Sequence, residues 1–294
     1  MKDEASTIKN RDYSSISPSA RSLLLLKGLT DIPFALEAAR LISQPEPYIP
    51  DFSKGNIIFW ARVLHFEARY KSINQLLWSL TAKNILELSS GFSFRGLDTV
   101  IDNDIHYIDT DLPNVIDIKQ KLEEALISSN FTPKGKLETL PLNALNETDF
   151  LNIINHFPEG EIAIVNEGLL VYLDIDEKRK LCQNIRTVLQ KRGGYWITAD
   201  IYIKSERKMP ELRVNDQLDQ FLKEHNTERN KFNSFAEAEF FFKSEGLVID
   251  QEAEPGYHSA SSLKYLMAVT TEEQRASLSK SGRTRATWRL KLAE

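Results

Sequence analysis

Hydrophobic positions recur at helical spacing through the first 80 residues of the chain. From about Asn56 to Leu80 the apolar residues are separated by three or four positions, which places them on one face of a helix. These residues are Phe59, Val63, Phe66, Tyr70, Ile73, Leu77 and Leu80. An earlier helix is predicted from about Ser19 to Ser43, ending before the helix-breaking Pro45-Glu46-Pro47. We expect the two helices to form an N-terminal helical cap, residues 1–80.

After residue 80 the pattern changes to short apolar runs, each followed by a turn signal and a stretch of helical periodicity. The runs are Ile85–Leu88, Ile105–Ile108, Ile162–Val165 and Tyr195–Thr198, with a weaker one at Gly135–Leu140 in the place of the third strand. Two helix starts support this pattern. Pro113 suits the first turn of one helix, and Asp174-x-x-Glu177 is a capping-box variant that opens another. The alternation is typical of βα units, so we predict an α/β fold with a mostly parallel sheet flanked by helices.

The regular pattern lapses after Asp200. A polar helical segment is expected at Glu211–Asn226, inside an irregular stretch, residues 201–233, that we interpret as a lid insertion. The remaining expected elements are Phe235–Glu245 and two final strands, Leu247–Glu252 and Leu263–Thr270. The α/β domain would then span residues 81–270.

The last residues, 271–294, carry a strong positive bias. Between Arg275 and Lys291 there are six basic residues and no acidic one. Such a stretch can bind nucleic acid or an anionic surface. However, Trp288 is its one aromatic side chain for stacking, and the whole chain has a net charge of −5. We therefore predict a solvated basic tail and no nucleic-acid partner.

The composition is that of an ordinary globular protein. Of the 294 residues, 41% are hydrophobic and 27% are charged, which excludes a disordered or collagen-like chain. The single cysteine, Cys182, excludes a disulfide framework within the chain. We interpret it as a packing residue rather than as a nucleophile. The aliphatic runs are far shorter than a membrane span, and the first residues lack an apolar signal core. We expect a soluble, cytoplasmic protein without a membrane partner. The five histidines show no ligand spacing with cysteines or acids, so no metal site is predicted.

Two features follow the first two predicted strands, at the sheet edge where open α/β sheets bind ligands. The small residues of Glu87-Leu88-Ser89-Ser90-Gly91 would let backbone approach a ligand, but the strict Gly-x-Gly is absent and a simple tight turn is the alternative. Asp111 lies twenty residues beyond Gly91, where an acidic side chain can accept hydrogen bonds from the ribose of an adenosine-containing cofactor. The alternative for Asp111 is a helix N-cap. Nicotinamide dinucleotides and S-adenosylmethionine both satisfy this pattern.

Three further side chains are candidates. Glu167 and Tyr172 lie in the otherwise apolar stretch after the fourth strand. A buried carboxylate is costly without a partner, so Glu167 either faces solvent or meets a cation, such as the ammonium of a methionine moiety. Arg69 lies beside the apolar face of the long helix, where a surface arginine with a packed stem is the alternative. The chain has no Walker lysine loop and no Gly-x-Ser-x-Gly elbow, which speaks against P-loop phosphoryl transfer and α/β-hydrolase chemistry.

From about Ser19 to Asp200, the order and spacing of these segments resemble the leucine carboxyl methyltransferases and their bacterial relatives, the O-methyltransferases of polyketide biosynthesis. The matching segments are Ala68-Arg69 followed by Ile73-Asn74-Gln75-Leu76-Leu77, then Ile85–Gly91, Asp111-Leu112-Pro113 and Asn166–Leu173. The last of these resembles the family's Glu-x-x-Leu-x-Tyr segment. The resemblance implies a Rossmann-like class I methyltransferase fold with a seven-stranded sheet. It also implies S-adenosylmethionine as cofactor and S-adenosylhomocysteine as product.

The resemblance implies roles for individual residues as well. Those expected at the cofactor are Arg69, Glu87, Ser89, Ser90, Gly91, Asp111, Leu112, Asn143, Ala144, Leu145 and Glu167. Among them, Asp111 would hold the ribose hydroxyls and Asn143-Ala144-Leu145 would flank the adenine. Glu167 would take the methionine ammonium. Ser89 departs from the family, which often has glycine at this position.

Catalysis would depend on three side chains that orient the acceptor oxygen, namely Arg69, Tyr172 and Arg21. Arg21 falls where the protein-methylating members have a substrate-binding lysine. A carboxylate acceptor is already ionised at neutral pH and needs no general base. A hydroxyl acceptor must lose its proton, and the candidate bases are Tyr172, Asp200 and His258.

The sequence therefore predicts an S-adenosylmethionine-dependent O-methyltransferase that acts on a carboxylate or hydroxyl oxygen of a small molecule, or less favourably of a protein C-terminus. Two alternatives stay open. One is an NAD(P)-dependent oxidoreductase, which the missing Gly-x-Gly-x-x-Gly disfavours. The other is a binding module that keeps the methyltransferase fold but does not catalyse methyl transfer. The altered Ser89-Ser90-Gly91 loop supports this alternative.

Overall fold

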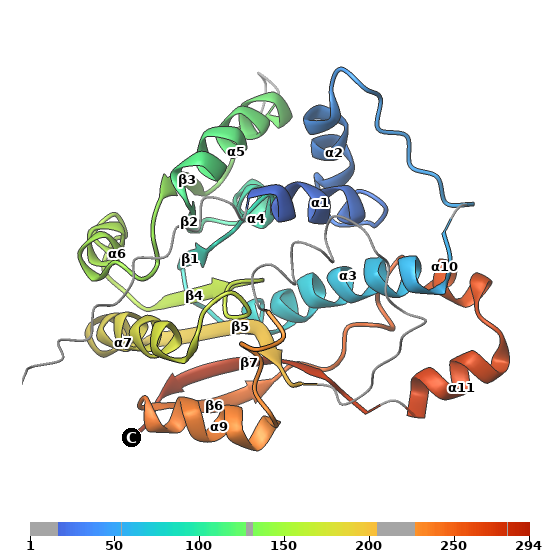
Figure 1. Ribbon diagram of the computed structural model, residues 1–294. Helices are drawn as coiled ribbons and strands as arrows, with labels where there is room; N and C mark the ends of the chain where they lie inside the picture. The colour runs from blue at the N-terminus through green and yellow to red at the C-terminus, as the bar shows by residue number, and fades with distance from the viewer. Residues whose placement is uncertain (1–16, 54, 128–131, 205–226, 281) are drawn as a thin grey trace, which may run out of the picture.

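The computed structural model describes residues 17–53, 55–127, 132–204, 227–280 and 282–294 (Figure 1). The helices are α1 (Ser17–Lys27), α2 (Ala35–Ser43), α3 (Ile57–Leu77), α4 (Arg95–Asp102), α5 (Pro113–Leu126), α6 (Glu147–Ile154), α7 (Ile175–Arg192), α9 (Phe235–Ser244), α10 (Leu263–Val269) and α11 (Glu272–Lys280). The strands are β1 (Asn84–Leu88), β2 (His106–Asp111), β3 (Lys136–Pro141), β4 (Ile162–Asn166), β5 (Gly194–Tyr202), β6 (Leu247–Glu252) and β7 (Arg285–Leu292).

These strands form one sheet in the order β3-β2-β1-β4-β5-β7-β6. Strands β1 to β5 pair in parallel, whereas β7 runs antiparallel to both of its neighbours, β5 and β6. The central strands β1 and β4 are buried along their whole length. Burial on both faces explains why most of their residues are apolar, without a regular alternation of apolar and polar positions.

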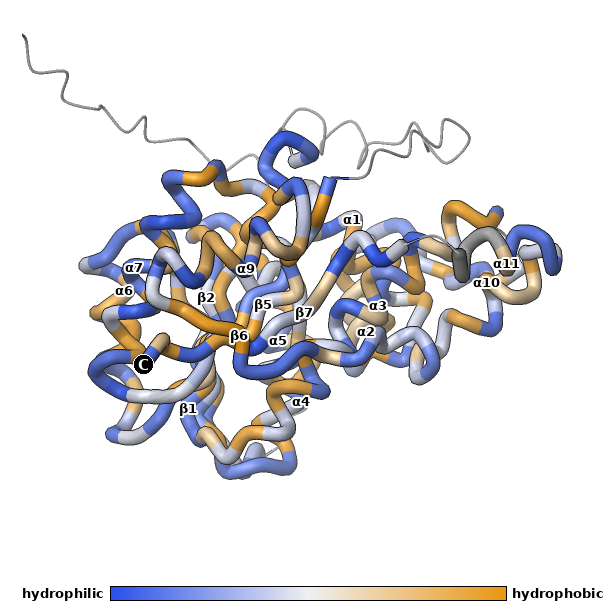
Figure 2. The backbone as a smooth tube through the Cα atoms, turned by 90° about the horizontal axis from the view of Figure 1, so that it is seen from below, coloured by the Kyte–Doolittle hydropathy of each residue, from blue (hydrophilic) through white to orange (hydrophobic). Residues whose placement is uncertain are grey.

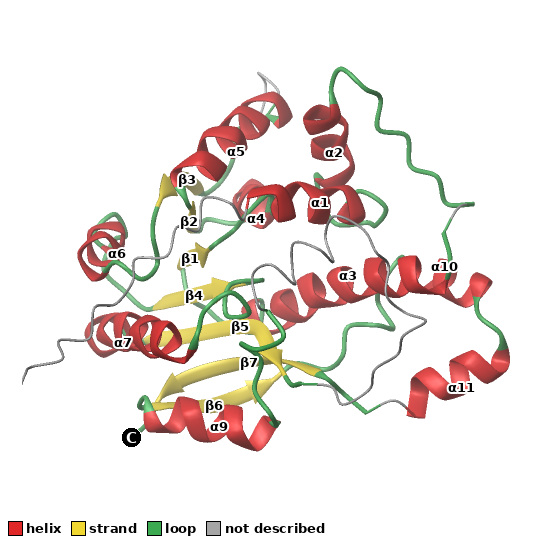
Figure 3. Cartoon of the chain, viewed as in Figure 1, coloured by secondary structure: helices red, strands yellow, loops and turns green. Residues whose placement is uncertain are grey.

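Helices cover both faces of the sheet (Figure 3). Successive strand residues point to opposite faces, so Ile85 packs with α3 and α4 in one core cluster, whereas Leu86 packs with α6 and α7 in the other. Helices α1 and α2 lie over α4 and α5 in a third cluster. Figure 2 shows hydrophobic segments along the strands and hydrophilic stretches in many of the outer connections. The carboxyl ends of β1, β2 and β4 lie at one edge of the sheet, next to α1.

Most predicted elements are confirmed. The five parallel strands lie where the apolar runs predicted them, including the third at Lys136–Pro141. The long helix begins after Asn56, whose side chain accepts hydrogen bonds from the backbone N–H groups of Ile58 and Phe59. Pro113 occupies the first turn of α5, and Asp174 with Glu177 forms the predicted capping box of α7.

The prediction of one helix from Ser19 to Ser43 is wrong. The structure has two helices, and α1 ends at Lys27, directly before Gly28. A Cβ atom at Gly28 would lie 2.9 Å from the Cβ atom of Ala39, so this glycine lets the chain fold back and α2 pack closely against α1. Pro33, which has no N–H to donate, lies in the connection. The break places Lys27 at the sheet edge.

The strand predicted at Leu263–Thr270 is also wrong, because this segment forms the helix α10. Ser262 lies at the start of α10. Its backbone N–H and its hydroxyl donate hydrogen bonds to the buried carboxylate of Glu67 on α3. Leu266 and Tyr265 then pack in one apolar cluster with Trp60 of α3. A short apolar run does not distinguish a strand from a buried helical turn.

The predicted solvated basic tail is wrong for residues 285–292, which form the buried strand β7. Its apolar side chains Ala286, Trp288 and Leu290 alternate and face the larger core cluster. Two of its basic side chains pair with Asp250 of β6: the Arg289 guanidinium lies 2.6 Å and the Lys291 ammonium 3.4 Å from the carboxylate. The limit of the α/β domain at residue 270 therefore omits a strand of its sheet.

The remaining C-terminal predictions have different outcomes. The element at Phe235–Glu245 is the helix α9, and the strand at Leu247–Glu252 is β6. The helix predicted at Glu211–Asn226 lies outside the described residues, as does most of the predicted lid insertion, 201–233. No described helix is both long and apolar enough to cross a membrane.

Candidate active site

Three loops meet at the carboxyl edge of the sheet because β1 lies between β2 and β4. The loop Ser89–Gly91 follows β1, Asp111 ends β2, and Glu167 follows β4. The register aligns Leu88 of β1 with Asn166 of β4, so the two loops leave the sheet side by side. The structure therefore brings together the residues that the sequence placed after these three strands.

The loop after β1 has an unusual backbone. Ser89 has a φ of 51° and Gly91 a φ of 52°, both in the left-handed region. Glycine adopts this conformation freely, whereas a serine there stores strain of order 1–3 kcal/mol. A Cβ atom at Gly91 would meet only Ala20 of α1, at 3.7 Å. The backbone at Gly91 is therefore not crowded, and α1 is its nearest cover.

Asp111 fastens this loop to the end of β2. Its Oδ2 accepts the Gly91 backbone N–H at 2.7 Å, and its Oδ1 accepts the Leu112 backbone N–H at 2.7 Å. The N-cap of α5 is Leu112, without a side-chain cap, so the helix-cap alternative for Asp111 is wrong. Burial raises the pKa of Asp111, while the two N–H donors oppose that rise. A carboxylate has about four acceptor positions, so about two remain beyond these backbone contacts.

Lys119 lies beneath the same loop and was missed by sequence reasoning. Its ammonium group is fully buried, 2.9 Å from Oδ2 of Asp109 and 2.9 Å from the hydroxyl oxygen of Ser90. Lys119 follows Val115 by one helical turn and precedes Leu122 by another, and both of those residues are buried. A lysine on the apolar face of a helix is the signal that could have revealed it.

Glu167 meets three cations of the protein itself. Its carboxylate lies 2.7 Å from the Lys27 ammonium, 3.1 Å from the Arg69 guanidinium and 3.0 Å from that of Arg95. These cations hold the pKa of Glu167 well below its ordinary value, against the opposing effect of burial. The sequence correctly required a cation here, but the expected partner, a methionine ammonium, is not needed to balance this carboxylate. We call Lys27, Arg69, Arg95 and Glu167 the cation cluster.

Glu87 supports this cluster from below rather than facing a ligand. Its side chain is fully buried, accepts a short hydrogen bond from the Tyr107 hydroxyl and lies 3.4 Å from Nε of Arg95. The Glu87 side chain therefore faces the protein interior, and its place beside the cofactor stays a prediction. Counting Glu87, three cations face two carboxylates, which leaves one positive charge in excess.

Arg69 is buried, so its interpretation as a surface arginine is wrong. Its guanidinium also lies 3.4 Å from the hydroxyl of Tyr202, at the end of β5. That hydroxyl lies 2.8 Å from Nε2 of His65, one turn before Arg69 on α3. Burial lowers the pKa of His65 well below its ordinary value, and Arg285 and Arg69 add to the effect. The imidazole is therefore neutral, and its Nε2 can accept a hydrogen bond from the Tyr202 hydroxyl. Tyr172 is buried near Arg69 and Tyr202, and burial raises its pKa.

Asp200 holds the loop that carries Glu167 and is not free to act as a base. Its carboxylate accepts the backbone N–H groups of Gly168, Leu169 and Leu170, and also the side-chain amide of Asn166. His258 is exposed in the connection before α10. Asp200 is therefore committed to structural contacts, whereas the roles of Tyr172 and His258 as bases stay predictions.

Arg21 does not join the cation cluster, because its side chain is exposed on α1. Lys27, six residues later and buried, contacts Glu167 in its place. The role of Arg21 toward an acceptor stays a prediction.

The segment expected beside the adenine follows β3 at the same edge of the sheet. Asn143 is exposed and its side chain accepts the Leu145 backbone N–H. The Ala144 carbonyl accepts the buried Asn184 amide of α7. These contacts fix the segment's backbone, and its role beside an adenine stays a prediction.

Two other expectations concern reactive groups. Cys182 is buried in the core, and burial raises the pKa of its thiol, which disfavours a nucleophilic role. Within the described ranges, no group of three or more histidine, cysteine, aspartate or glutamate residues could hold a metal ion.

The sheet order, with β7 inserted antiparallel between β5 and β6, is that of the Rossmann-like class I methyltransferase fold. No family model matches the sequence, and no curated protein matches it.

Solved structures resemble the chain distantly. The mitomycin 7-O-methyltransferase is 11% identical, with 79% of this chain and 57% of that chain covered and a TM-score of 0.45. An O-methyltransferase family protein from Burkholderia thailandensis is 14% identical, with coverages of 81% and 59% and a TM-score of 0.46. The magnesium protoporphyrin IX methyltransferase from Synechocystis PCC 6803, with bound SAH, is 10% identical, with coverages of 90% and 96% and a TM-score of 0.49. This chain thus spans little more than half of the first two, and such distant similarities carry no argument about its activity.

Proposed function

We propose that this chain is an S-adenosylmethionine-dependent O-methyltransferase of the leucine carboxyl methyltransferase type, which acts on a carboxylate or hydroxyl oxygen of a small molecule. The observation that carries the proposal is the meeting of Asp111, Gly91 and the cation cluster at one edge of the sheet. The acid that would hold the nucleoside ends β2, and the cation cluster is centred on Glu167 after β4, on the other side of β1.

The residues at this edge fit the cofactor. Asp111 is half-buried and keeps acceptor positions for two ribose hydroxyls beyond its two backbone contacts. The uncrowded backbone at Gly91 suits close approach of a nucleoside. The excess positive charge of the cation cluster suits a carboxylate, either that of the methionine moiety or that of the acceptor. Burial lowers the pKa of Lys27, with Arg69 adding to the effect, so another anion nearby would stabilise its ammonium form.

S-adenosylmethionine, when bound, supplies an electrophilic methyl group. The chain's own contribution is then to bind, orient and exclude water, and orientation alone is worth roughly 7–11 kcal/mol in well-aligned systems. Glu167 holds the Arg69 guanidinium in place. A planar guanidinium is suited to two-point contact with a carboxylate. Tyr172 and Tyr202 place two hydroxyl groups near that guanidinium. Because Asp200 is committed to backbone donors, a carboxylate acceptor, which needs no base, agrees best with the site.

Calorimetric titration of the full chain with S-adenosylmethionine or S-adenosylhomocysteine tests this proposal. We expect micromolar binding by the wild type and at least tenfold weaker binding by Asp111→Ala, because the substitution removes both ribose acceptors. Asp104→Ala is the matched control: Asp104 is exposed at the opposite end of β2, and its loss is expected to change nothing. Absence of wild-type binding, or equal binding by Asp111→Ala, would refute the proposal.

Two further measurements separate the alternatives. Saturable quenching or enhancement of NAD(P)H fluorescence would favour an oxidoreductase. Cofactor binding without methyl transfer to any member of a carboxylate and phenol panel would favour a binding module without turnover.

A further inference from the structure

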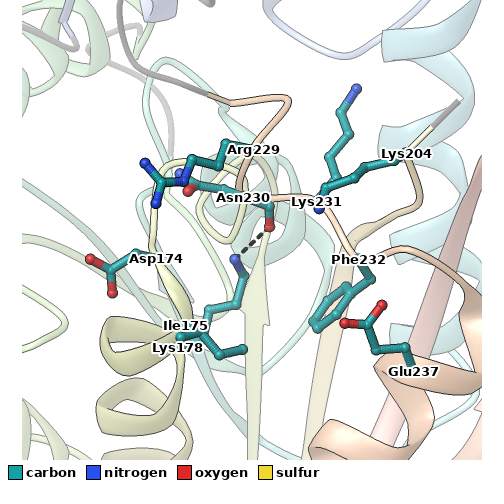
Figure 4. Close-up of a pocket in the computed structure, with 9 residues that line it drawn as sticks. All are labelled: Asp174, Ile175, Lys178, Lys204, Arg229, Asn230, Lys231, Phe232 and Glu237. Atoms are coloured by element: carbon teal, nitrogen blue, oxygen red, sulfur yellow. Dashed lines mark hydrogen bonds between the residues drawn. The ribbon is translucent and has the colours of Figure 1, made fainter. Parts of the chain in front are cut away.

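A second group of basic side chains lies apart from the cation cluster, in a pocket at the amino end of α7 (Figure 4). The pocket has a volume of about 340 Å³ and lies between α7 and the segment 229–232. Its charged lining residues, four basic and two acidic, are Lys178, Lys204, Arg229, Lys231, Asp174 and Glu237. The lining therefore carries a net charge of +2 when all six are ionised. We call it the basic pocket.

Both acids of the basic pocket are committed to backbone groups. Asp174 accepts the N–H groups of Asp176 and Glu177 as the cap of α7. Glu237 accepts the N–H of Asn233 at the start of α9. Lys231 also pairs with Glu228, just outside the lining, so the positive charges that remain to be balanced are those of Lys178, Lys204 and Arg229.

Lys178 is the clearest case of an unbalanced charge. Its side chain is 2% exposed, and its ammonium donates to the backbone carbonyls of Leu173 and Asn230 at 2.6 and 2.7 Å. No carboxylate of the described chain forms a salt bridge with it, and one of its three N–H groups is left over. Burial lowers the pKa of Lys178 to about 8, so it is still mostly charged at neutral pH. The carboxylates of Asp174, Glu177 and Asp200 oppose this lowering of the pKa, but none forms a salt bridge with Lys178. A buried ammonium without a carboxylate in contact is costly, and an anion in the pocket would offset that cost.

The basic pocket adjoins the acceptor side of the candidate active site. The Lys231 ammonium lies 5.8 Å from the centroid of the Tyr202 ring, and the Tyr202 hydroxyl contacts Arg69. The Asn230 amide donates to the carbonyl of Val171, the residue before Tyr172. Both tyrosines near Arg69 are thus connected to the wall of the basic pocket.

We propose that the basic pocket binds an anionic group, a phosphate or a carboxylate, that the methyl acceptor carries in addition to the oxygen that is methylated. The identity of the ligand as part of the acceptor rests on the proposed function. The binding of an anion to the pocket does not, because it can be measured without cofactor or turnover.

Calorimetric titration of the full chain at low ionic strength with inorganic phosphate and, separately, with succinate tests anion binding. We expect one saturable site for at least one of the two probes, and the tighter probe identifies the favoured anionic group. The double variant Arg229→Gln/Lys231→Gln is expected to bind at least tenfold more weakly. Both side chains are at least partly exposed, so the fold should tolerate their loss. Lys191→Gln, exposed at the other end of α7, is the matched control and is expected to bind as the wild type does.

Absence of saturable binding, or equal affinity in the double variant, would overturn the inference whatever the cofactor titration shows. Methyl transfer to paired acceptors with and without a second acidic group tests the remaining step. We expect the acidic member of each pair to have a KM at least tenfold lower, an advantage that the double variant loses while kcat is kept. Equal KM values within the pairs would overturn the assignment to the acceptor. Phosphate binding without S-adenosylmethionine binding would refute the proposed function while leaving the anion site in place.

Discussion

Replacing Glu167 with glutamine is expected to lower the free energy of unfolding by about 3–5 kcal/mol, the usual cost of removing one partner from a buried ion pair. Glutamine has nearly the same shape, so the change removes charge rather than volume. The side chain of Glu167 is 4% exposed and its carboxylate contacts Lys27, Arg69 and Arg95. Without it, three cations face only Glu87, so mutual repulsion is added to the cost of their burial.

The pH dependence of this loss has a definite sign. The three cations hold the folded-state pKa of Glu167 below its unfolded value, which is about 4.3. The stabilising contribution is therefore complete above that unfolded value and is lost as the pH falls towards the folded one. Urea unfolding of the wild type and Glu167→Gln should show a constant difference from pH 5 to 8 that narrows below about pH 4.

The matched control for this experiment is Glu159→Gln. Glu159 is exposed in the turn before β4, at the opposite end of the strand that Glu167 follows, and its substitution is expected to change stability by less than about 0.5 kcal/mol. A Glu167→Gln variant as stable as this control, or a difference that widens in acid, would show that the cation cluster is not balanced by Glu167.

Local patterns predicted the residues of the site that directly follow a strand. Ser89–Gly91, Asp111 and Glu167 occupy such positions, and the geometry of a parallel sheet requires the ends of neighbouring strands to lie at one edge. Arg69 was found through its place in a family motif. These predictions needed only the strand positions and the order of the segments.

The partners of these residues depend on how distant helices dock, which no local pattern specifies. Lys27 reaches Glu167, 140 positions away, because the break at Gly28 places the end of α1 over the sheet edge. Arg95 reaches it from the first turn of α4, and Tyr202 reaches Arg69 from the end of β5. The partners of Glu167 follow from tertiary packing, whereas the need for a cation beside it followed from elementary electrostatics.

The error at the C-terminus has a different origin. The last segment contains both a run of basic residues and a period-two alternation of Ala286, Trp288 and Leu290. The alternation is the stronger indicator, because it is typical of a half-buried strand. One acid of β6, Asp250, pairs with both Arg289 and Lys291, about 40 residues later in the chain. A charge run is therefore informative only after the partners across the sheet are known.

The Lys119→Met variant is expected to lose about 3–5 kcal/mol of unfolding free energy at pH 8, because it leaves the fully buried Asp109 without its counter-ion. Burial already raises the pKa of Asp109 to about 7 despite the nearby ammonium, and removing that ammonium raises it further. An acid with a raised folded-state pKa takes up a proton on folding, so the variant's stability falls as the pH rises towards that pKa, by about 1.4 kcal/mol for each pH unit. The deficit should therefore be smaller at pH 5.5 than at pH 8.

The double variant Lys119→Met/Asp109→Leu distinguishes this charge effect from a loss of packing. Replacing both partners of a buried pair with apolar side chains is often neutral or stabilising, so chemical denaturation should show the double variant to be more stable than Lys119→Met at pH 8, with no pH-dependent deficit. Equal losses in the single and double variants would mean that the methylene chain of Lys119, rather than its charge, supports the fold. Both variants also deprive the Ser90 hydroxyl of its donor. Weakened S-adenosylmethionine binding that persists in the double variant after stability is restored would therefore show that Lys119 positions the Ser89–Gly91 loop.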